Sequence, residues 1–146
     1  MHRTHGLHQD GQILFAGYAT AVDNGSADGV ADCFAADGTA SYEGGAMVYR
    51  GRAAIRDFFA GQAFAPSTHL IGNVLTKTED GCLRVTGSAL VCVTRTPGKV
   101  TFRGVQYRLD CVIDDGQLRI GRLEHRAIWQ AAVPGGPIQQ AIQHEG

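Results

Sequence analysis

Residues 68–130 carry the strongest signal for the fold, in the stretch THLIGNVLTKTEDGCLRVTGSALVCVTRTPGKVTFRGVQYRLDCVIDDGQLRIGRLEHRAIWQ. Apolar and β-branched residues dominate it, and turn-forming residues interrupt it at 79–81, 97–99 and 115–116. The pattern predicts four long strands, over residues 68–78, 82–96, 100–114 and 118–130. Because the turns are short, we expect consecutive strands to pair antiparallel and to form one curled sheet.

Helical spacing precedes these strands. Apolar residues recur at this spacing from residue 13 to residue 22, and Asn24-Gly25 is typical of a helix end. Ser26 is typical of an N-cap, which predicts a second helix over residues 27–35 with Val30 and Phe34 facing inward. The other elements expected before residue 68 are short strands over 39–42 and 47–49 and a third helix over 51–59.

The length of 146 residues and the hydrophobic content of 44% fit one domain with a single core. A sheet that is longer than three helices can cover must close around its own side chains or around a ligand. We therefore expect an α+β cone, with three N-terminal helices packed on a curved, mainly antiparallel sheet that encloses a cavity. Residues 1–8 are expected to be a flexible N-terminus, and residues 131–146 a C-terminal tail or lid.

The charge balance argues against nucleic acid as a partner, because 13 basic residues stand against 14 acidic ones without any long basic run. No apolar run approaches the roughly 20 residues that cross a bilayer, and residues 1–10 lack the apolar stretch of a secretory signal. We expect a cytoplasmic protein that does not bind membranes. Four cysteines without metal-ligand spacing are expected to be reduced core residues, and no metal site is predicted: Cys33, Cys82, Cys92 and Cys111.

Three motifs stand in this order of elements: YRGRAAI at 49–55, THLIGN at 68–73 and DDGQLRI at 114–120. With their spacing, they resemble the SnoaL-like branch of the NTF2-like superfamily over about residues 8–130. The resemblance implies the cone described above, and a homodimer formed through the sheet. Members of the superfamily include scytalone dehydratase, polyketide cyclases, ketosteroid isomerase, epoxide hydrolases and a dehydrochlorinase, so the fold alone does not fix the reaction.

The dehydratase and dehydrochlorinase members have an Asp at the end of the first helix and a His on the first long strand. Asp23 and His69 stand at these places. The resemblance implies that His69 removes a proton and later returns it to a leaving group, while Asp23 orients the imidazole. An imidazole can act in both directions near neutral pH, and the pair needs no cofactor. The ordinary alternatives are a helix-end Asp before a turn and a buried His in a strand.

Other candidate residues would contact the substrate. Tyr18 is a candidate hydrogen-bond donor to a substrate oxygen, or else a core aromatic residue. Strict alternation along the strand puts Asn73 on the same side as His69, where its amide could hold a substrate oxygen. Three more residues are candidates at the mouth of the cone or on the last strand: Tyr42, Tyr49 and Arg126. On that strand, alternation does not decide whether Arg126 or His125 faces the cavity.

The sequence therefore predicts a cofactor-independent acid–base enzyme, in first place a dehydratase or related lyase that acts on a small hydrophobic oxygenated molecule of polyketide or steroid type. A polyketide cyclase or an isomerase would use the same site. Epoxide hydrolysis is a further alternative, for which Arg108 and Asp110 are the candidate residues. The fold also suits a non-catalytic ligand-binding or assembly subunit.

Overall fold

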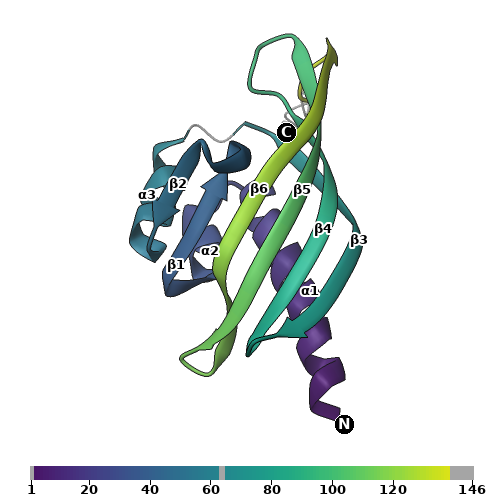
Figure 1. Ribbon diagram of the computed structural model, residues 1–146. Coiled ribbons are helices and arrows are strands. Elements are labelled where there is room, and N and C mark those ends of the chain that lie inside the picture. The colour runs from purple at the N-terminus through teal and green to yellow at the C-terminus, as the bar shows by residue number, and fades with distance from the viewer. Residues whose placement is uncertain (1, 63–64, 139–146) are drawn as a thin grey trace, which may run out of the picture.

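The computed structural model describes residues 2–62 and 65–138 (Figure 1). Its elements follow one another as α1 (His2–Asp23), α2 (Ala27–Asp32), β1 (Phe34–Tyr42), the 3-10 turn η1 (Glu43–Gly45), β2 (Met47–Arg50), α3 (Arg52–Gly61), β3 (Ser67–Glu79), β4 (Cys82–Val93), β5 (Lys99–Asp114) and β6 (Gln117–Pro134). The helices therefore precede the long strands, as the sequence predicts.

One sheet contains six strands in the order β2-β1-β6-β5-β4-β3. Neighbouring strands pair antiparallel except β1 and β6, which pair parallel. The sheet is curved and not closed, and the helices lie together on one side of it (Figure 1). The predicted α+β architecture, with three helices packed on a curved and mainly antiparallel sheet, is confirmed.

The core lies between the helices and the concave face of the sheet. Helix α1 contributes Phe15 and Tyr18, each 1% exposed, and the sheet contributes Leu109 and Leu123, which are fully buried. The helix boundaries have local causes: Gly25 has a φ of 68°, the left-handed conformation that follows a helix end. Ser26 Oγ accepts a hydrogen bond from Gly29 N–H and so caps α2.

Two boundaries near the N-terminus differ from the prediction. Helix α1 begins at His2, so residues 2–8 are helical where a flexible N-terminus is expected. Helix α2 ends at Asp32, and Phe34 opens β1 instead of continuing the helix. The cause is a contact with the last strand, because Ile120 N–H donates to the Cys33 carbonyl at 2.8 Å and Phe34 pairs with Ile120.

The C-terminal prediction is wrong over residues 131–134, which belong to β6 and pair with the start of β5. Residues 139–146 of the predicted tail or lid lie outside the described residues.

Within residues 2–62 and 65–138, no helix combines the length and the hydropathy needed to cross a membrane. The four cysteines are free thiols. The described part of the chain contains no group of three or more His, Cys, Asp or Glu side chains arranged to hold a metal ion.

Candidate active site

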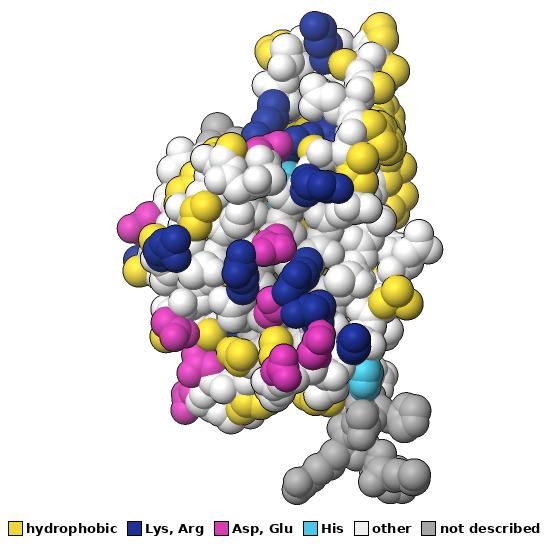
Figure 2. Space-filling model, in the orientation of Figure 1, with side chains coloured by type: hydrophobic (Ala, Val, Ile, Leu, Met, Phe, Trp, Pro, Cys, Tyr) yellow, Lys and Arg dark blue, Asp and Glu magenta, His cyan; other side chains and the backbone are white. Residues whose placement is uncertain are grey.

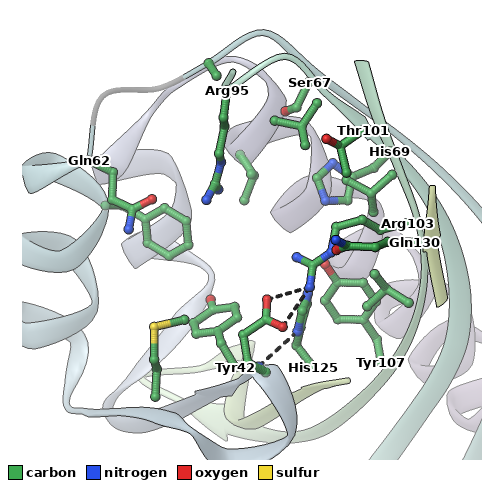
Figure 3. Close-up of a pocket in the computed structure, with 18 of the residues that line it drawn as sticks. Tyr42, Gln62, Ser67, His69, Arg95, Thr101, Arg103, Tyr107, His125 and Gln130 are labelled. Atoms are coloured by element: carbon green, nitrogen blue, oxygen red, sulfur yellow. Dashed lines mark hydrogen bonds and ion pairs between the residues drawn. The ribbon is translucent and has the colours of Figure 1, made fainter. Parts of the chain in front are cut away.

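A cavity of about 350 Å³ opens between the helices and the concave face of the sheet (Figure 3). Its walls come from α1, α3, the β1–β2 connection and the four long strands. Many of the wall residues are apolar, among them Val22, Phe58, Phe59, Val91 and Val105. Polar side chains, described below, share the wall with these apolar residues.

Asp23 and His69 meet at one side of the cavity. His69 Nδ1 lies 2.6 Å from Asp23 Oδ1, and the His69 backbone N–H donates to Asp23 Oδ2 at 2.8 Å. Ser67 Oγ–H donates to Asp23 Oδ1 at 2.7 Å. The His69 side chain is only 6% exposed, and the Asp23 side chain is 22% exposed. An imidazole that donates from Nδ1 in its neutral form has an unprotonated Nε2, which is the form a general base requires.

Tertiary contacts explain why this carboxylate is tolerated at a helix end. A negative charge at the C-terminus of a helix is unfavourable because the helix dipole is negative there. Asp23, the last residue of α1, is compensated by the hydroxyl and N–H donors at the beginning of β3, from Ser67 and His69. The end of α1 and the beginning of β3 are thereby held together at the cavity.

Two tyrosines form a second polar group in the cavity. The hydroxyls of Tyr18 and Tyr42 are 2.8 Å apart, and both side chains are buried. Burial raises the pKa of Tyr18 well above its usual value, and it raises the pKa of Tyr42 in the same way. Both hydroxyls are therefore neutral near pH 7. In this pair one hydroxyl donates to the other, which leaves one proton free for a further acceptor.

His125 faces the cavity from β6, between the rings of Tyr42 and Tyr107. It is 8% exposed, and its Nδ1 accepts a hydrogen bond from the Glu43 backbone N–H at 3.3 Å. This contact places the proton of the neutral ring on Nε2. Burial is the largest cause of a lowered pKa for His125, so the ring is neutral near pH 7. The side chain is a hydrogen-bond donor through Nε2.

An ion pair lies next to His125. Arg103 Nη2 on β5 contacts the two Glu43 carboxylate oxygens at 2.8 and 2.7 Å. The hydrogen bond from Arg103 is the largest cause of a lowered pKa for Glu43. Glu43 thus connects both neighbours, since its backbone holds His125 and its side chain holds Arg103. Its φ of 54° places it in the left-handed region, at the turn where β1 ends.

Four of the candidates proposed from sequence lie together in the structure. Tyr18, Tyr42 and His69 line the cavity, and Asp23 lies behind His69. Tyr49 does not line the cavity. It stacks on Phe58, with ring centroids 4.2 Å apart, and thus supports a wall residue.

Asn73 does not lie on His69's side of the sheet, because the register of β3 shifts between Gly72 and Leu75. A bulge of this kind breaks strict alternation. Asn73 has a φ of 52°, is exposed, and lines a second hollow with Arg126 on the opposite face. On that face, Arg126 Nη2 donates to Gln106 Oε1 at 3.3 Å. The placement expected for these two residues is therefore corrected.

The pair suggested for epoxide hydrolysis is also away from the cavity. Arg108 and Asp110 alternate with buried Tyr107, Leu109 and Cys111, so they project from the convex face. There Asp110 accepts a hydrogen bond from Arg84 Nε at 3.0 Å. Figure 2 shows basic and acidic side chains intermixed over the strands of this face.

Residues that sequence reasoning missed include Arg103, Glu43 and Gln130. Arg103 could have been found, because it shares the alternation of Val105 and Tyr107 on β5. Gln130 could not, because β6 contains a bulge between the pairs Gly104–Trp129 and Val105–Ala127. This bulge turns Gln130 into the cavity and leaves Trp129 half-exposed over Gly104, where a Cβ atom would overlap the indole ring.

Acid should destabilise the protein through His125. The pKa of His125 is lower in the folded state than in the unfolded chain. Its contribution to the free energy of unfolding is therefore fully present above the unfolded pKa of about 6.5, and it is lost as the pH falls through the lowered folded pKa. In His125→Gln, the free energy of unfolding should therefore fall less steeply with decreasing pH, by at most ~1.4 kcal/mol per pH unit. Urea unfolding at pH 7.5, 6.5 and 5.5 measures this. Arg56→Gln, an exposed position on α3, should keep the wild-type dependence. An acid dependence of His125→Gln identical to that of the wild type would contradict the prediction.

Comparisons with known proteins come from sequence and from structure. A sequence profile of the SnoaL-like domain matches residues 12–124. No curated protein matches the chain. Among solved structures, a type 3 hexachlorocyclohexane dehydrochlorinase from Novosphingobium barchaimii is 15% identical with a TM-score of 0.80, over 93% of this chain and 96% of that one.

Two proteins from Novosphingobium aromaticivorans are also similar. A candidate scytalone dehydratase is 20% identical with a TM-score of 0.76, over 97% of this chain and 99% of that one. An NTF2-like protein with a cystatin-like fold is 20% identical with a TM-score of 0.75, over 86% of this chain and 84% of that one. At these identities the structural likeness shows the shared fold.

Proposed function

The chain belongs to the SnoaL-like domain family, within the NTF2-like fold, and from this premise we propose that it is a cofactor-independent acid–base enzyme of the lyase type. The resemblance stated from sequence is thereby confirmed at the level of the family. The reaction we favour is a dehydration, in which a proton and a hydroxide leave neighbouring carbon atoms of one substrate.

The observation that carries the proposal is the 2.6 Å contact between His69 Nδ1 and Asp23 Oδ1 at the wall of the cavity. The carboxylate stabilises the imidazolium that forms when Nε2 accepts a proton, and it fixes the orientation of the ring. Because the His69 side chain is 6% exposed, little water competes with the substrate for this nitrogen. The arrangement provides a positioned base with its own counter-charge.

In the proposed reaction, His69 Nε2 removes a proton from a carbon next to a substrate carbonyl. The electrons of the C–H bond move onto the carbonyl oxygen, which becomes an enolate. The O–H group of the Tyr18–Tyr42 pair that is not used within the pair donates a hydrogen bond to this oxygen, and so does His125 Nε2–H when the substrate spans the cavity. The carbonyl then re-forms, and the electron pair of the enolate carbon–carbon bond makes a double bond to the neighbouring carbon as its C–O bond breaks. His69 protonates the departing hydroxide to give water.

The size and walls of the cavity support a small hydrophobic oxygenated substrate of polyketide or steroid type. About 350 Å³ is within the range of small-molecule sites, and its wall offers apolar side chains for a hydrocarbon skeleton together with polar groups for oxygen atoms. The dehydratase and dehydrochlorinase named among the similar structures fit an elimination. An isomerase or a cyclase begins with the same proton removal and remains the second candidate. We do not propose epoxide hydrolysis, because Arg108 and Asp110 project from the other face.

The experiment uses 3-hydroxy-1-tetralone, which gives fluorescent 1-naphthol when it loses water. The wild-type protein should form 1-naphthol faster than buffer does, and in D₂O it should exchange the proton next to the carbonyl. Exchange without naphthol would favour an isomerase or a cyclase. If neither exchange nor naphthol exceeds the rate in buffer, for this compound and for its 6- and 8-hydroxy derivatives, the proposed elimination is contradicted.

Two further proposals concern the setting of the enzyme. We propose a cytoplasmic location, which four free thiols support. We also propose a homodimer in which the convex face of the sheet is the interface. Its intermixed charges, such as the Arg122–Glu124 pair at 2.8 Å, can pair with the same surface of a second copy.

A further inference from the structure

The charged side chains that line the cavity are not balanced. Arg95, Arg103 and Glu43 all contribute to its wall, which gives two cations and one carboxylate. Figure 3 shows the Arg95 side chain reaching into the open space, with Arg103 on another side of the same space. The whole chain carries 13 basic and 14 acidic residues. The excess of positive charge is therefore a local property of this cavity.

Glu43 leaves most N–H donors of the two arginines without a partner. Both of its oxygens contact one nitrogen of Arg103, Nη2. Arg103 Nε is buried and has no hydrogen-bond partner among the residues that the structure describes. A guanidinium has five N–H donors, so this one-nitrogen pairing leaves Arg103 with unused donors. Arg95 makes no hydrogen bond or ion pair with any described residue, and it acts on Glu43 only through its charge.

The other nearby carboxylate does not balance the arginines. Asp23 stands behind His69 and does not line the cavity. Its oxygens are held by Ser67 Oγ, the His69 backbone N–H and His69 Nδ1, at 2.6 to 2.8 Å. Its charge is thus committed to the imidazole. A ligand in the cavity meets the arginines as the uncompensated charges.

We propose that the substrate is a carboxylate, and that Arg95 and Arg103 bind its carboxylate group while His69 acts on the ring system. The inference rests on the proposed function, because it assigns the anionic end of the substrate to the cavity in which His69 removes the proton. Guanidinium groups match the planar geometry of a carboxylate, and hydrogen bonds between charged partners are the stronger ones. The apolar wall takes the rest of the molecule. Arg95, which has no competing carboxylate in contact, contributes more than Arg103.

The test compares two probes of nearly equal shape, 2-naphthoate and neutral 2-naphthamide, by isothermal titration calorimetry at pH 7.5. The wild-type protein should bind the naphthoate about tenfold more tightly than the amide. Arg95→Gln should weaken binding of the naphthoate about fivefold, the larger share of this preference, and leave binding of the amide unchanged. Arg95 is exposed, so its replacement leaves the core intact. Arg56→Gln, an exposed arginine on α3 that pairs with Asp28, should change neither affinity.

Three results would overturn the inference: equal affinity of the two probes for the wild-type protein, an equal effect of Arg95→Gln on both, or no binding of the naphthoate at millimolar concentration. Turnover is not needed for this measurement. If the naphthoate binds through Arg95 while the protein catalyses neither exchange nor dehydration, the proposed function fails and the anion site stands. If the protein dehydrates the neutral tetralone and ignores the carboxylate, the function stands and the anion site fails.

Discussion

Replacing His69 with asparagine should lower turnover of a dehydration substrate by about 10²- to 10⁴-fold, which is the usual contribution of a general acid–base group. Asparagine can still donate a hydrogen bond to Asp23, but it has no nitrogen that accepts a proton near neutral pH. The fold should be retained, because the backbone N–H of residue 69 still reaches Asp23 Oδ2. The measurement is the single-turnover rate of 1-naphthol formation, with circular dichroism to check the fold.

Two further variants test whether the loss of turnover in His69→Asn comes from the Asp23–His69 pair. Asp23→Asn should lose less than His69→Asn, because the base remains while its counter-charge is removed. Arg56→Gln, an exposed position on α3 away from the cavity, should react at the wild-type rate. Binding of 2-naphthamide to His69→Asn should equal binding to the wild type, which separates loss of chemistry from loss of the cavity. A His69→Asn protein that is folded and fully active would remove the assigned base.

The second large effect concerns stability. Phe34→Ala should lower the free energy of unfolding by about 3–5 kcal/mol, the usual cost of removing a buried phenylalanine ring. The Phe34 side chain is fully buried, and it meets the Tyr18 ring edge to face with centroids 6.1 Å apart. The Phe34 backbone carbonyl, which the variant keeps, accepts two hydrogen bonds from the Arg52 guanidinium at 2.9 and 2.7 Å, so the expected loss comes from the ring alone. Urea unfolding at pH 7.5 measures the change.

Ile113→Ala is the matched control for this prediction. The Ile113 side chain is 64% exposed, so its truncation should change the free energy of unfolding by no more than ~0.5 kcal/mol. Because Phe34 supports the ring of Tyr18, Phe34→Ala should also reduce turnover in the temperature range where it remains folded. A loss of stability no larger than that of Ile113→Ala would show that the core around Tyr18 does not depend on this ring.

The long strands could be predicted from sequence because their signal is local. Alternation of apolar residues and short turns placed the four strands close to the observed Ser67–Glu79, Cys82–Val93, Lys99–Asp114 and Gln117–Pro134. The end of α2 could not be predicted in the same way. Phe34 faces inward in a helix or in a strand, and its strand conformation depends on pairing with Ile120, far along the chain. Tertiary contact decides such a boundary, not the local pattern.

The candidate site was predictable only in part. No spacing rule joins Asp23 to His69, and their pairing was expected from the family resemblance; the structure brings them to 2.6 Å, and their catalytic roles stay predictions. Strict alternation placed Asn73 on the wrong face because it cannot anticipate the bulge after Gly72. The same pattern left His125 and Arg126 undecided, although buried Leu123, two residues before His125, has the same orientation.

The proposed acid–base pair and the proposed carboxylate-binding arginine lie on different kinds of segment, and this has an evolutionary consequence. Asp23 and His69 belong to the end of α1 and the beginning of β3, whereas Arg95 lies in the connection between β4 and β5. Connecting segments tolerate substitutions and insertions better than the elements they join. If both proposals hold, descendants of this protein can acquire new substrate preferences by changing the β4–β5 hairpin while the proposed acid–base pair is inherited intact.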